Sequence, residues 1–126
     1  MLAKVILMAE PLRNPDELQQ QLTEFQETQR QLQFVSNQKS QLQMQVEELK
    51  MAEEEVGKAE KGTIYRVVGP LLLETSKTDA TSDLKGKKEL FEMRITVLSK
   101  QEDKLRPRFD ELRASLEKAI KENRLR

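Results

Sequence analysis

Mostly apolar side chains recur every three and four positions along the second half of the chain, and this spacing limits the possible folds more than any other feature. The recurring positions are Leu84, Lys88, Phe91, Ile95, Leu98, Glu102, Leu105, Phe109, Leu112, Leu116, Ala119 and Asn123. An alternation of four and three sustained this long is the period of a coiled-coil helix. Such a helix buries one narrow seam and needs a partner helix. We expect it over residues 77–124, with a bend near Asp103 to Pro107, because Pro107 removes a helical hydrogen bond.

The first half of the chain has the same spacing with one irregularity. A helix-start signal occurs at residues 14–16, where asparagine, proline and aspartate follow one another. The expected seam positions are Leu18, Leu22, Phe25, Gln29, Leu32, Val35, Lys39, Leu42, Val46, Leu49, Glu53 and Val56. Two successive steps of three, from Gln29 to Leu32 to Val35, predict a slip in the phase of the seam. We expect this helix over residues 15–60.

One stretch between the two helical patterns has the composition of a β-hairpin. Residues 62–75 have the sequence GTIYRVVGPLLLET, in which two short apolar runs flank a Gly-Pro turn signal. A lone two-stranded hairpin is marginal in water, so we expect strands of other subunits to complete it. The residues expected to carry this assembly are Ile64, Tyr65, Val67, Val68, Gly69, Leu71, Leu72 and Leu73.

The charges of the two helices favour pairing within one chain. Residues 16–60 contain ten acidic and four basic residues, a net charge of −6, whereas residues 77–126 contain ten acidic and fourteen basic residues, a net charge of +4. Opposite flanking charges favour pairing of unlike helices. The fold expected is therefore mainly α: a long antiparallel two-helix coiled coil with one hairpin between the helices, in a single domain over residues 15–126. Leu18 would lie near Ala119, and Phe25 near Leu112.

Antiparallel pairing would bring both chain ends together, where the apolar residues exceed what a two-helix seam can hide. We name these the tip residues and expect them to form an interaction surface, because exposed apolar patches usually mark one. They are Leu12, Leu18, Leu22, Phe25, Phe109, Leu112, Leu116 and Ile120.

Composition argues against an enzyme. The 126-residue chain has no cysteine and no histidine, so the usual zinc ligands and the usual general base at neutral pH are missing. No glycine-rich phosphate loop is present, and we expect no metal or cofactor. The net charge of zero argues against nucleic-acid binding. Residues 1–14 form an apolar extension, which Glu10 and Pro11 interrupt too early for a membrane span, so a soluble, cytoplasmic protein is expected.

The order helix, single hairpin, helix resembles the β-type subunits of the prefoldin family, found in archaea, and their eukaryotic counterpart, prefoldin subunit 6. The stretch from Ile64 to Leu105 resembles the family's strand, glycine turn, strand and second helix, and the Gln-rich stretch from Leu18 to Leu49 resembles its first helix. The resemblance implies a co-chaperone without ATP. Hairpins of α-type and β-type subunits would join into a β-barrel of a hetero-hexamer, and the tips would hold unfolded proteins and deliver them to a group II chaperonin.

A structural coiled-coil adaptor without chaperone activity is the alternative. In that case the hairpin would be incidental to assembly. A helical nucleic-acid binder is a third possibility, which would need a basic face.

Overall fold

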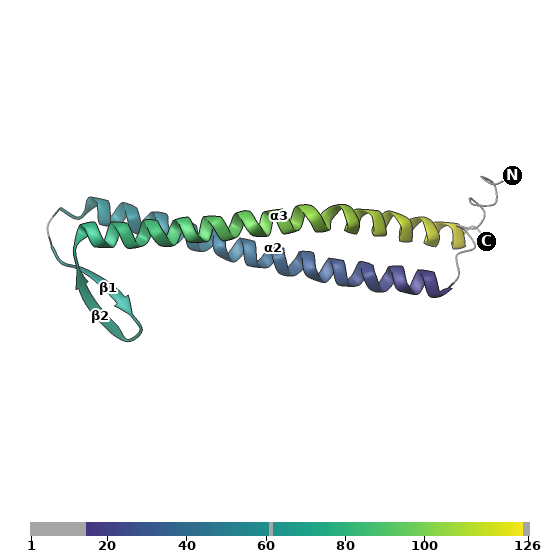
Figure 1. The fold of residues 1–126 in the computed structure, drawn as a ribbon, viewed down its shortest axis with the longest axis horizontal. Coiled ribbons are helices and arrows are strands. Elements are labelled where there is room, and N and C mark those ends of the chain that lie inside the picture. Colours follow the sequence, from purple (N-terminus) through teal and green to yellow (C-terminus); the bar gives the residue numbers. More distant parts are fainter. Residues whose placement is uncertain (1–14, 61, 125–126) are drawn as a thin grey trace. The chain divides into compact units, whose positions relative to one another are not determined.

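The computed structural model describes residues 15–60 and 62–124 of the chain, which form two long helices joined by a hairpin (Figure 1). Helix α2 spans Pro15–Lys58 and helix α3 spans Lys77–Arg124, with 44 and 48 residues. Strands β1 (Ile64–Val68) and β2 (Leu71–Thr75) lie between them. The mainly α fold with a single hairpin, predicted from the sequence, is confirmed.

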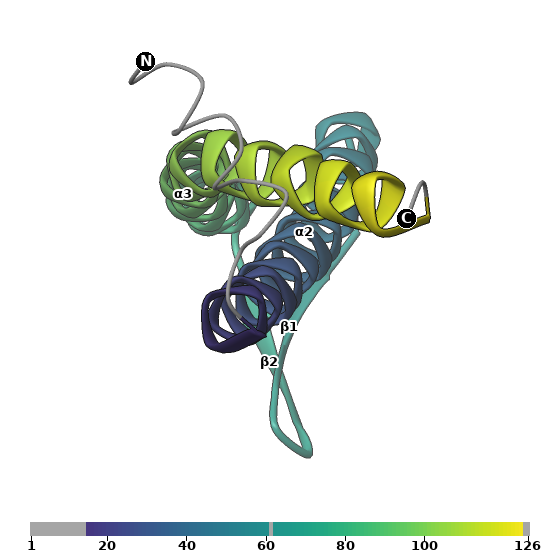
Figure 2. The same cartoon turned by 90° about the vertical axis from the view of Figure 1, so that its right-hand side faces the viewer.

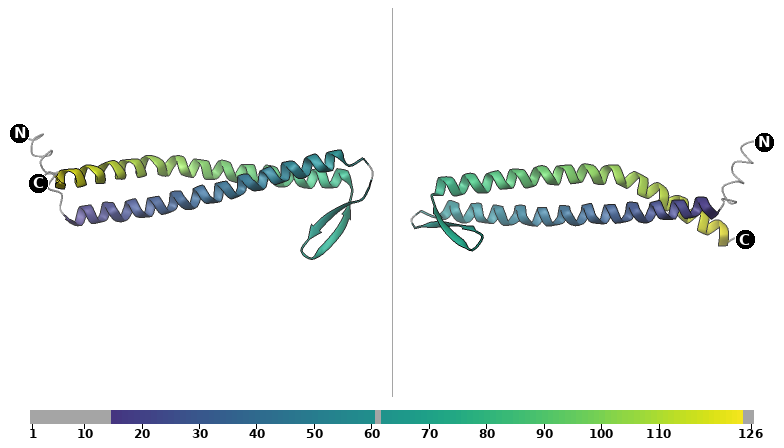
Figure 3. Two further views of the ribbon diagram at one scale, coloured as in Figure 1. Left: turned by 180° about the vertical axis from the view of Figure 1, so that it is seen from behind. Right: turned by 60° about the horizontal axis from the view of Figure 1, so that its bottom comes forward.

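The chain divides into two compact units through which both helices pass. Unit 1 comprises Met1–Ser36 and Lys100–Arg126, and unit 2 comprises Asn37–Ser99. In unit 1, α2 and α3 run in opposite directions. In unit 2, residues 37–58 of α2 and 77–99 of α3 also run alongside each other in opposite directions, as both views of Figure 3 show.

The seam of α2 differs from the expected one at two positions. Thr28 is buried, with 7% of its surface exposed, whereas Gln29 is exposed. Gln21 is half-buried, and Leu22 remains 38% exposed. The covered positions 21, 25, 28, 32 and 35 alternate steps of four and three, so the predicted phase slip is wrong. A straight helix keeps one face toward its partner, even where that face carries polar residues.

The seam of α3 follows the expected positions. Every one from Leu84 to Ala119 is buried or half-buried, and Leu112, with 1% of its surface exposed, is the most buried large side chain in the described part of the chain. Phe25 stacks on Phe109, with ring centroids 5.0 Å apart, which is one helical turn before the Leu112 that we expected as its neighbour. Helix α3 continues through Pro107, and the bend near this residue stays a prediction.

Helix α3 begins with a side-chain cap and a tie to the end of α2. The backbone N–H of Asp79 donates to Ser76 Oγ at 3.0 Å, which satisfies one of the free donors of the first turn. Lys77 Nζ donates to the carbonyl of Gly57 at 3.1 Å. This carbonyl lies in the last turn of α2, where a cation is favoured.

The hairpin is a regular antiparallel pair with a two-residue turn. Val68 pairs with Leu71, and Ile64 pairs with Thr75 at the other end. Gly69 has a φ of +57°, and the proline ring holds Pro70 at a negative φ. This combination matches a type II′ turn, whose twist fits that of the strands. Figures 1 and 2 show the turn end standing clear of the helices of unit 2.

Candidate functional site

Five of the tip residues line one apolar groove in unit 1. The groove has a volume of about 600 Å³, and its lining residues come from the first turns of α2 and the last turns of α3. They are Pro15, Leu18, Gln19, Leu22, Phe25, Arg113, Leu116, Glu117, Ala119 and Ile120. We call this cavity the tip groove. Its centre is apolar, and its charged members, Arg113 and Glu117, form an ion pair at 3.8 Å.

The tip residues divide by exposure into a floor and a rim. Ile120 is 53% exposed and Leu22 is 38% exposed, so both offer apolar surface to a partner. Leu18, Phe25, Phe109 and Leu116 are half-buried. Leu112 packs inside the helix pair, and Leu12 lies outside the described residues. The structure thus brings Leu18, Leu22, Phe25, Leu116 and Ile120 together around one groove, as their positions at the chain ends predict.

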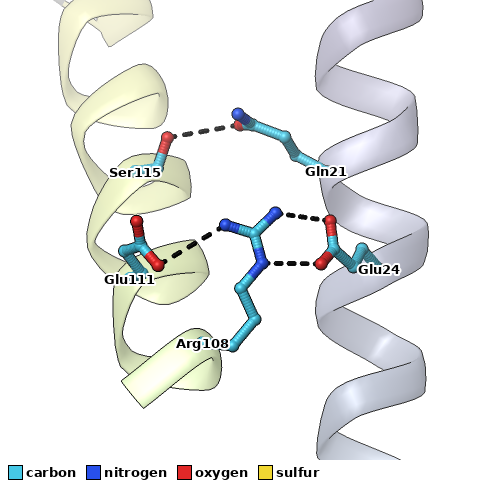
Figure 4. A network of polar contacts seen from close by, with 5 residues as sticks. All are labelled: Gln21, Glu24, Arg108, Glu111 and Ser115. Atoms are coloured by element: carbon cyan, nitrogen blue, oxygen red, sulfur yellow. Dashed lines mark hydrogen bonds and ion pairs between the residues drawn. The ribbon is translucent and has the colours of Figure 1, made fainter. Parts of the chain in front are cut away.

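A polar network links the two helices beside the stacked phenylalanines (Figure 4). The guanidinium of Arg108 donates to both carboxylate oxygens of Glu24, through Nε and Nη2, each at 2.6 Å. It also reaches Glu111 on its own helix at 3.5 Å. One helical turn from Glu24 on α2, Gln21 Oε1 accepts a hydrogen bond from Ser115 Oγ on α3 at 3.2 Å. These contacts hold α2 against α3 next to the tip groove.

The network shifts the protonation of its charged members. The hydrogen bonds from Arg108 lower the pKa of Glu24 below its ordinary value, and partial desolvation only partly opposes this. The same bonds raise the pKa of Arg108. Glu24 and Arg108 therefore remain a charged pair at neutral pH. The side chains are still nearly half exposed, at 45% and 47%, so water screens the pair.

A second groove in unit 1 contains a residue that the sequence analysis did not single out. Phe34 is 62% exposed and lies off the seam. With Val35 and Leu105 it forms the apolar part of a groove of about 550 Å³, whose other lining residues are Glu27, Arg30, Gln31, Gln101 and Lys104. The sequence does contain a signal for this exposure. Phe34 directly precedes the seam residue Val35, and a heptad places the position before a seam residue outside the seam.

The hairpin exposes apolar side chains on both of its faces. Tyr65, Val67 and Leu72 share one face with exposures of 57%, 70% and 67%. Val68, Leu71 and Leu73 share the other, with exposures of 44%, 58% and 42%. Ile64 is half-buried. Both edges of the two-stranded sheet also lack a neighbouring strand in the described part of the chain.

Two ion pairs stabilise unit 2 around the base of the hairpin. Arg66 on β1 contacts Asp83 on α3 at 2.9 Å. Lys88 and Glu53, which occupy facing seam positions, contact each other at 2.7 Å and are only 23% and 24% exposed. The hydrogen bond to Glu53 raises the pKa of Lys88. Polar seam positions near the hairpin thus pair with each other.

Comparison with known proteins relates this architecture to one family. A family model described as prefoldin subunit matches residues 19–123, which covers most of both helices and the whole hairpin. The chain belongs to the prefoldin subunit family.

Individual prefoldin relatives agree along nearly their whole length. A prefoldin subunit beta from Methanosarcina acetivorans is 37% identical over 107 residues, which are 84% of this chain and 92% of the relative. Another from Thermococcus onnurineus is 39% identical over 85% of this chain and 93% of its own length. The crystal structure of the prefoldin beta subunit from Thermococcus strain KS-1 matches with a TM-score of 0.74 at 35% identity, covering 83% of this chain and 93% of that chain.

Membership of the prefoldin family supports a co-chaperone role and association with other prefoldin subunits. Among residues 15–60 and 62–124, no three His, Cys, Asp or Glu side chains gather closely enough to hold a metal ion. Within the same part of the chain, neither helix is long and apolar enough to cross a lipid bilayer. In the described part of the chain, apolar side chains are exposed at the tip groove, the Phe34 groove and the hairpin, among other places.

Proposed function

We propose that this chain is a subunit of an ATP-independent prefoldin co-chaperone, which binds unfolded or nascent proteins at the tip of its coiled coil and transfers them to a group II chaperonin. The observation that supports it most is the tip groove, an open apolar surface built by five tip residues on the ends of two helices. An unfolded chain exposes apolar side chains of varied shape, which such a surface can cover.

The geometry favours weak and adaptable binding. Leu22 and Ile120 stand partly exposed on the rim, where their side chains have room to change rotamer. Phe25 lines the groove and is held in place by its stacking on Phe109, beside the polar network, which gives this part of the groove a fixed wall. Binding at one groove would be weak, but several grooves in one assembly would hold the same client together with much higher avidity.

The hairpin would supply that assembly. Its apolar residues are exposed on both faces, and its unpaired edges can accept strands of α-type and β-type prefoldin subunits. We propose that the hairpins close into a β-barrel in a hetero-hexamer, in which the helices carry the client-binding surfaces. Function and assembly would then reside in different units of the chain.

The test removes the apolar rim without removing the fold. The double variant Leu22→Asp and Ile120→Asp is assembled with an α-type prefoldin subunit, and suppression of the aggregation of a chemically unfolded client is measured by light scattering. Charges in the groove oppose apolar contact. The variant complex should therefore be needed in at least ten times the amount for the same suppression, which corresponds to a loss of about 1.4 kcal/mol in binding. The mass of the complex should stay unchanged.

A matched control places the same charges elsewhere on exposed apolar positions. Met44 and Met93 in unit 2 are 65% and 60% exposed, so Met44→Asp with Met93→Asp should suppress aggregation as the unaltered complex does. Equal activity of the tip variant and the unaltered complex would contradict the proposal and favour the coiled-coil adaptor. Delivery is measured separately, as the yield of folded client after addition of a group II chaperonin and ATP.

A further inference from the structure

An apolar segment precedes helix α2 in the sequence, and the helix begins at the tip groove. Pro15, the first residue of α2, is itself one of the lining residues of that groove. Eight of the nine residues from Met1 to Ala9 are apolar, and Lys4 is the exception. The longest uninterrupted apolar run of the chain, Val5 to Ala9, therefore ends six positions before a residue that lines this open apolar groove.

We propose that residues 1–12 dock in the tip groove as an intramolecular competitor of clients. This inference rests on the proposed client-binding function of the groove and adds its regulation. The groove is a surface for an extended apolar segment, and the segment has the same chemistry as an unfolded client. Because it is covalently attached, the segment is present at the groove at a higher local concentration than a free client.

Chain length permits this docking. From Pro15 to Phe25 the groove extends over about 15 Å of helix, at about 1.5 Å per residue. Twelve residues reach at most about 40 Å when extended. Residues 11–14, which include a proline and an asparagine, separate the apolar run from the helix and can carry the change of direction.

The charges of the two partners also fit. The groove places Arg113 and Glu117 among its lining residues, one of each sign, around an apolar centre. The segment carries Lys4 and Glu10, one of each sign, on either side of its run of Val5 to Ala9. An apolar run flanked by opposite charges can enter this groove without burying an unpaired charge.

The expected consequence is a graded block of client binding. A short tether gives the segment an effective concentration on the order of millimolar at its groove. Even weak docking then occupies a sizeable fraction of the grooves, and the apparent affinity for a client falls by the fraction that stays open. Clients that expose long apolar stretches would displace the segment, whereas nearly folded proteins would not.

The experiment uses the full complex with an α-type prefoldin subunit and a fluorescently labelled unfolded client. Variant one replaces Val5, Ile6 and Leu7 by Ser, which keeps length and charge, and variant two deletes residues 2–13. Both should bind the client several-fold more tightly than the unaltered complex. The control Arg13→Gln lies outside residues 1–12, keeps the apolar run and should stay within twofold of it. Unchanged affinity would overturn the inference, and so would weaker binding, because the segment would then itself hold clients.

A direct measurement locates the segment. Because the chain has no cysteine, Ala9→Cys provides a single site for a nitroxide label. Docking should broaden the methyl resonances of Leu22 and Ile120 and leave those of Val67 in the hairpin sharp. If the resonances of Leu22 and Ile120 stay sharp, the segment does not dock in the groove.

The two proposals fail separately. In the deletion variant, Leu22→Asp with Ile120→Asp should abolish client binding. If binding persists there, the client-binding function of the groove is wrong whatever the segment does. If binding is lost there but the deletion alone leaves affinity unchanged, only the competitor role is wrong.

Discussion

Gly69 is the residue on which the geometry of the hairpin depends. Its φ of +57° lies in the left-handed region, which side chains with a Cβ disfavour by roughly 1–2 kcal/mol. A Cβ at this position would meet no atom within 4 Å, so the cost of a substitution is conformational and not steric. The Gly-Pro pair in the sequence predicts a turn, and the positive φ explains why the first of the two is glycine.

Gly69→Ala should loosen the hairpin without unfolding the helices. A cost of about 1 kcal/mol corresponds to a factor of about five in the opening equilibrium. Amide hydrogen exchange in β1 and β2, measured by NMR on the isolated full chain, should therefore be roughly fivefold faster, since exchange follows local opening.

The matched control is Gly86→Ala, where a Cβ also meets open space but the glycine lies inside α3 without a positive φ. Alanine is favoured over glycine in a helix by roughly 0.5–1 kcal/mol, so exchange in the first turns of α3 should become slower. Exchange that changes in the same direction in both variants would contradict the conformational explanation.

At the scale of the elements, the α3 seam could be predicted from the sequence and the α2 seam only in part. In α3 the apolar residues occupy nearly every seam position, so their period directly gives the buried face. In α2 the seam was predicted at Leu22 because it is apolar, whereas the helix half-buries Gln21 and buries Thr28. The buried positions continue the alternation of four and three residues that includes Leu32 and Val35. The hydrophobicity of each residue taken singly does not reveal this face.

The sequence also predicted opposite charges on the two helices, but not which of them would meet. Glu24 and Arg108 are separated by 84 positions along the chain and form the network beside the Phe25 and Phe109 stack. Pairing of individual side chains depends on the register between α2 and α3. Leu18 and Ala119 line the same groove, as expected, whereas Phe25 stacks on Phe109. Phe109 lies one helical turn from the Leu112 expected beside Phe25.

The Glu24–Arg108 pair should make helix pairing in unit 1 weaken in acid. The pKa of Glu24 in the folded chain lies below its ordinary value of 4.5, so the charged pair stabilises the fold above that value. The contribution is lost as the pH falls through the lowered pKa. In the variant Glu24→Gln, the melting temperature should be lower at neutral pH by a few degrees at most, because both side chains are nearly half exposed.

Circular dichroism at 222 nm, recorded during heating at neutral pH and at about pH 2, measures this difference. The difference between the unaltered chain and Glu24→Gln should shrink toward zero in acid, because a protonated Glu24 no longer pairs with a cation. Glu54→Gln, at an exposed position of α2 in unit 2, is the control and should leave the melting temperature unchanged at neutral pH. A difference that is constant with pH would show that the charge of Glu24 does not stabilise the helix pair.

At the scale of the whole molecule, a single chain leaves much apolar surface uncovered. Most of the hairpin residues expected to carry assembly are exposed, on both faces of the sheet, whereas Ile64 and Thr75 at its base are half-buried. The sequence indicated this need because three consecutive leucines in a strand place apolar groups on both sides. It did not reveal Phe34, whose exposure depends on the exact phase of α2.

Assembly through the hairpin is tested by Val67→Lys with Leu72→Lys. These residues are directly paired across the strands and are 70% and 67% exposed, so lysines there are tolerated by the single chain but oppose packing against another subunit. Sedimentation velocity, with the chain alone and mixed with an α-type prefoldin subunit, should show smaller species than the unaltered protein forms. Met44→Lys with Met51→Lys, at positions 65% and 61% exposed on α2, is the matched control and should assemble normally. If the hairpin variant keeps the full mass, the exposed faces of β1 and β2 do not hold the assembly together, and the contacts between subunits must come from the helices.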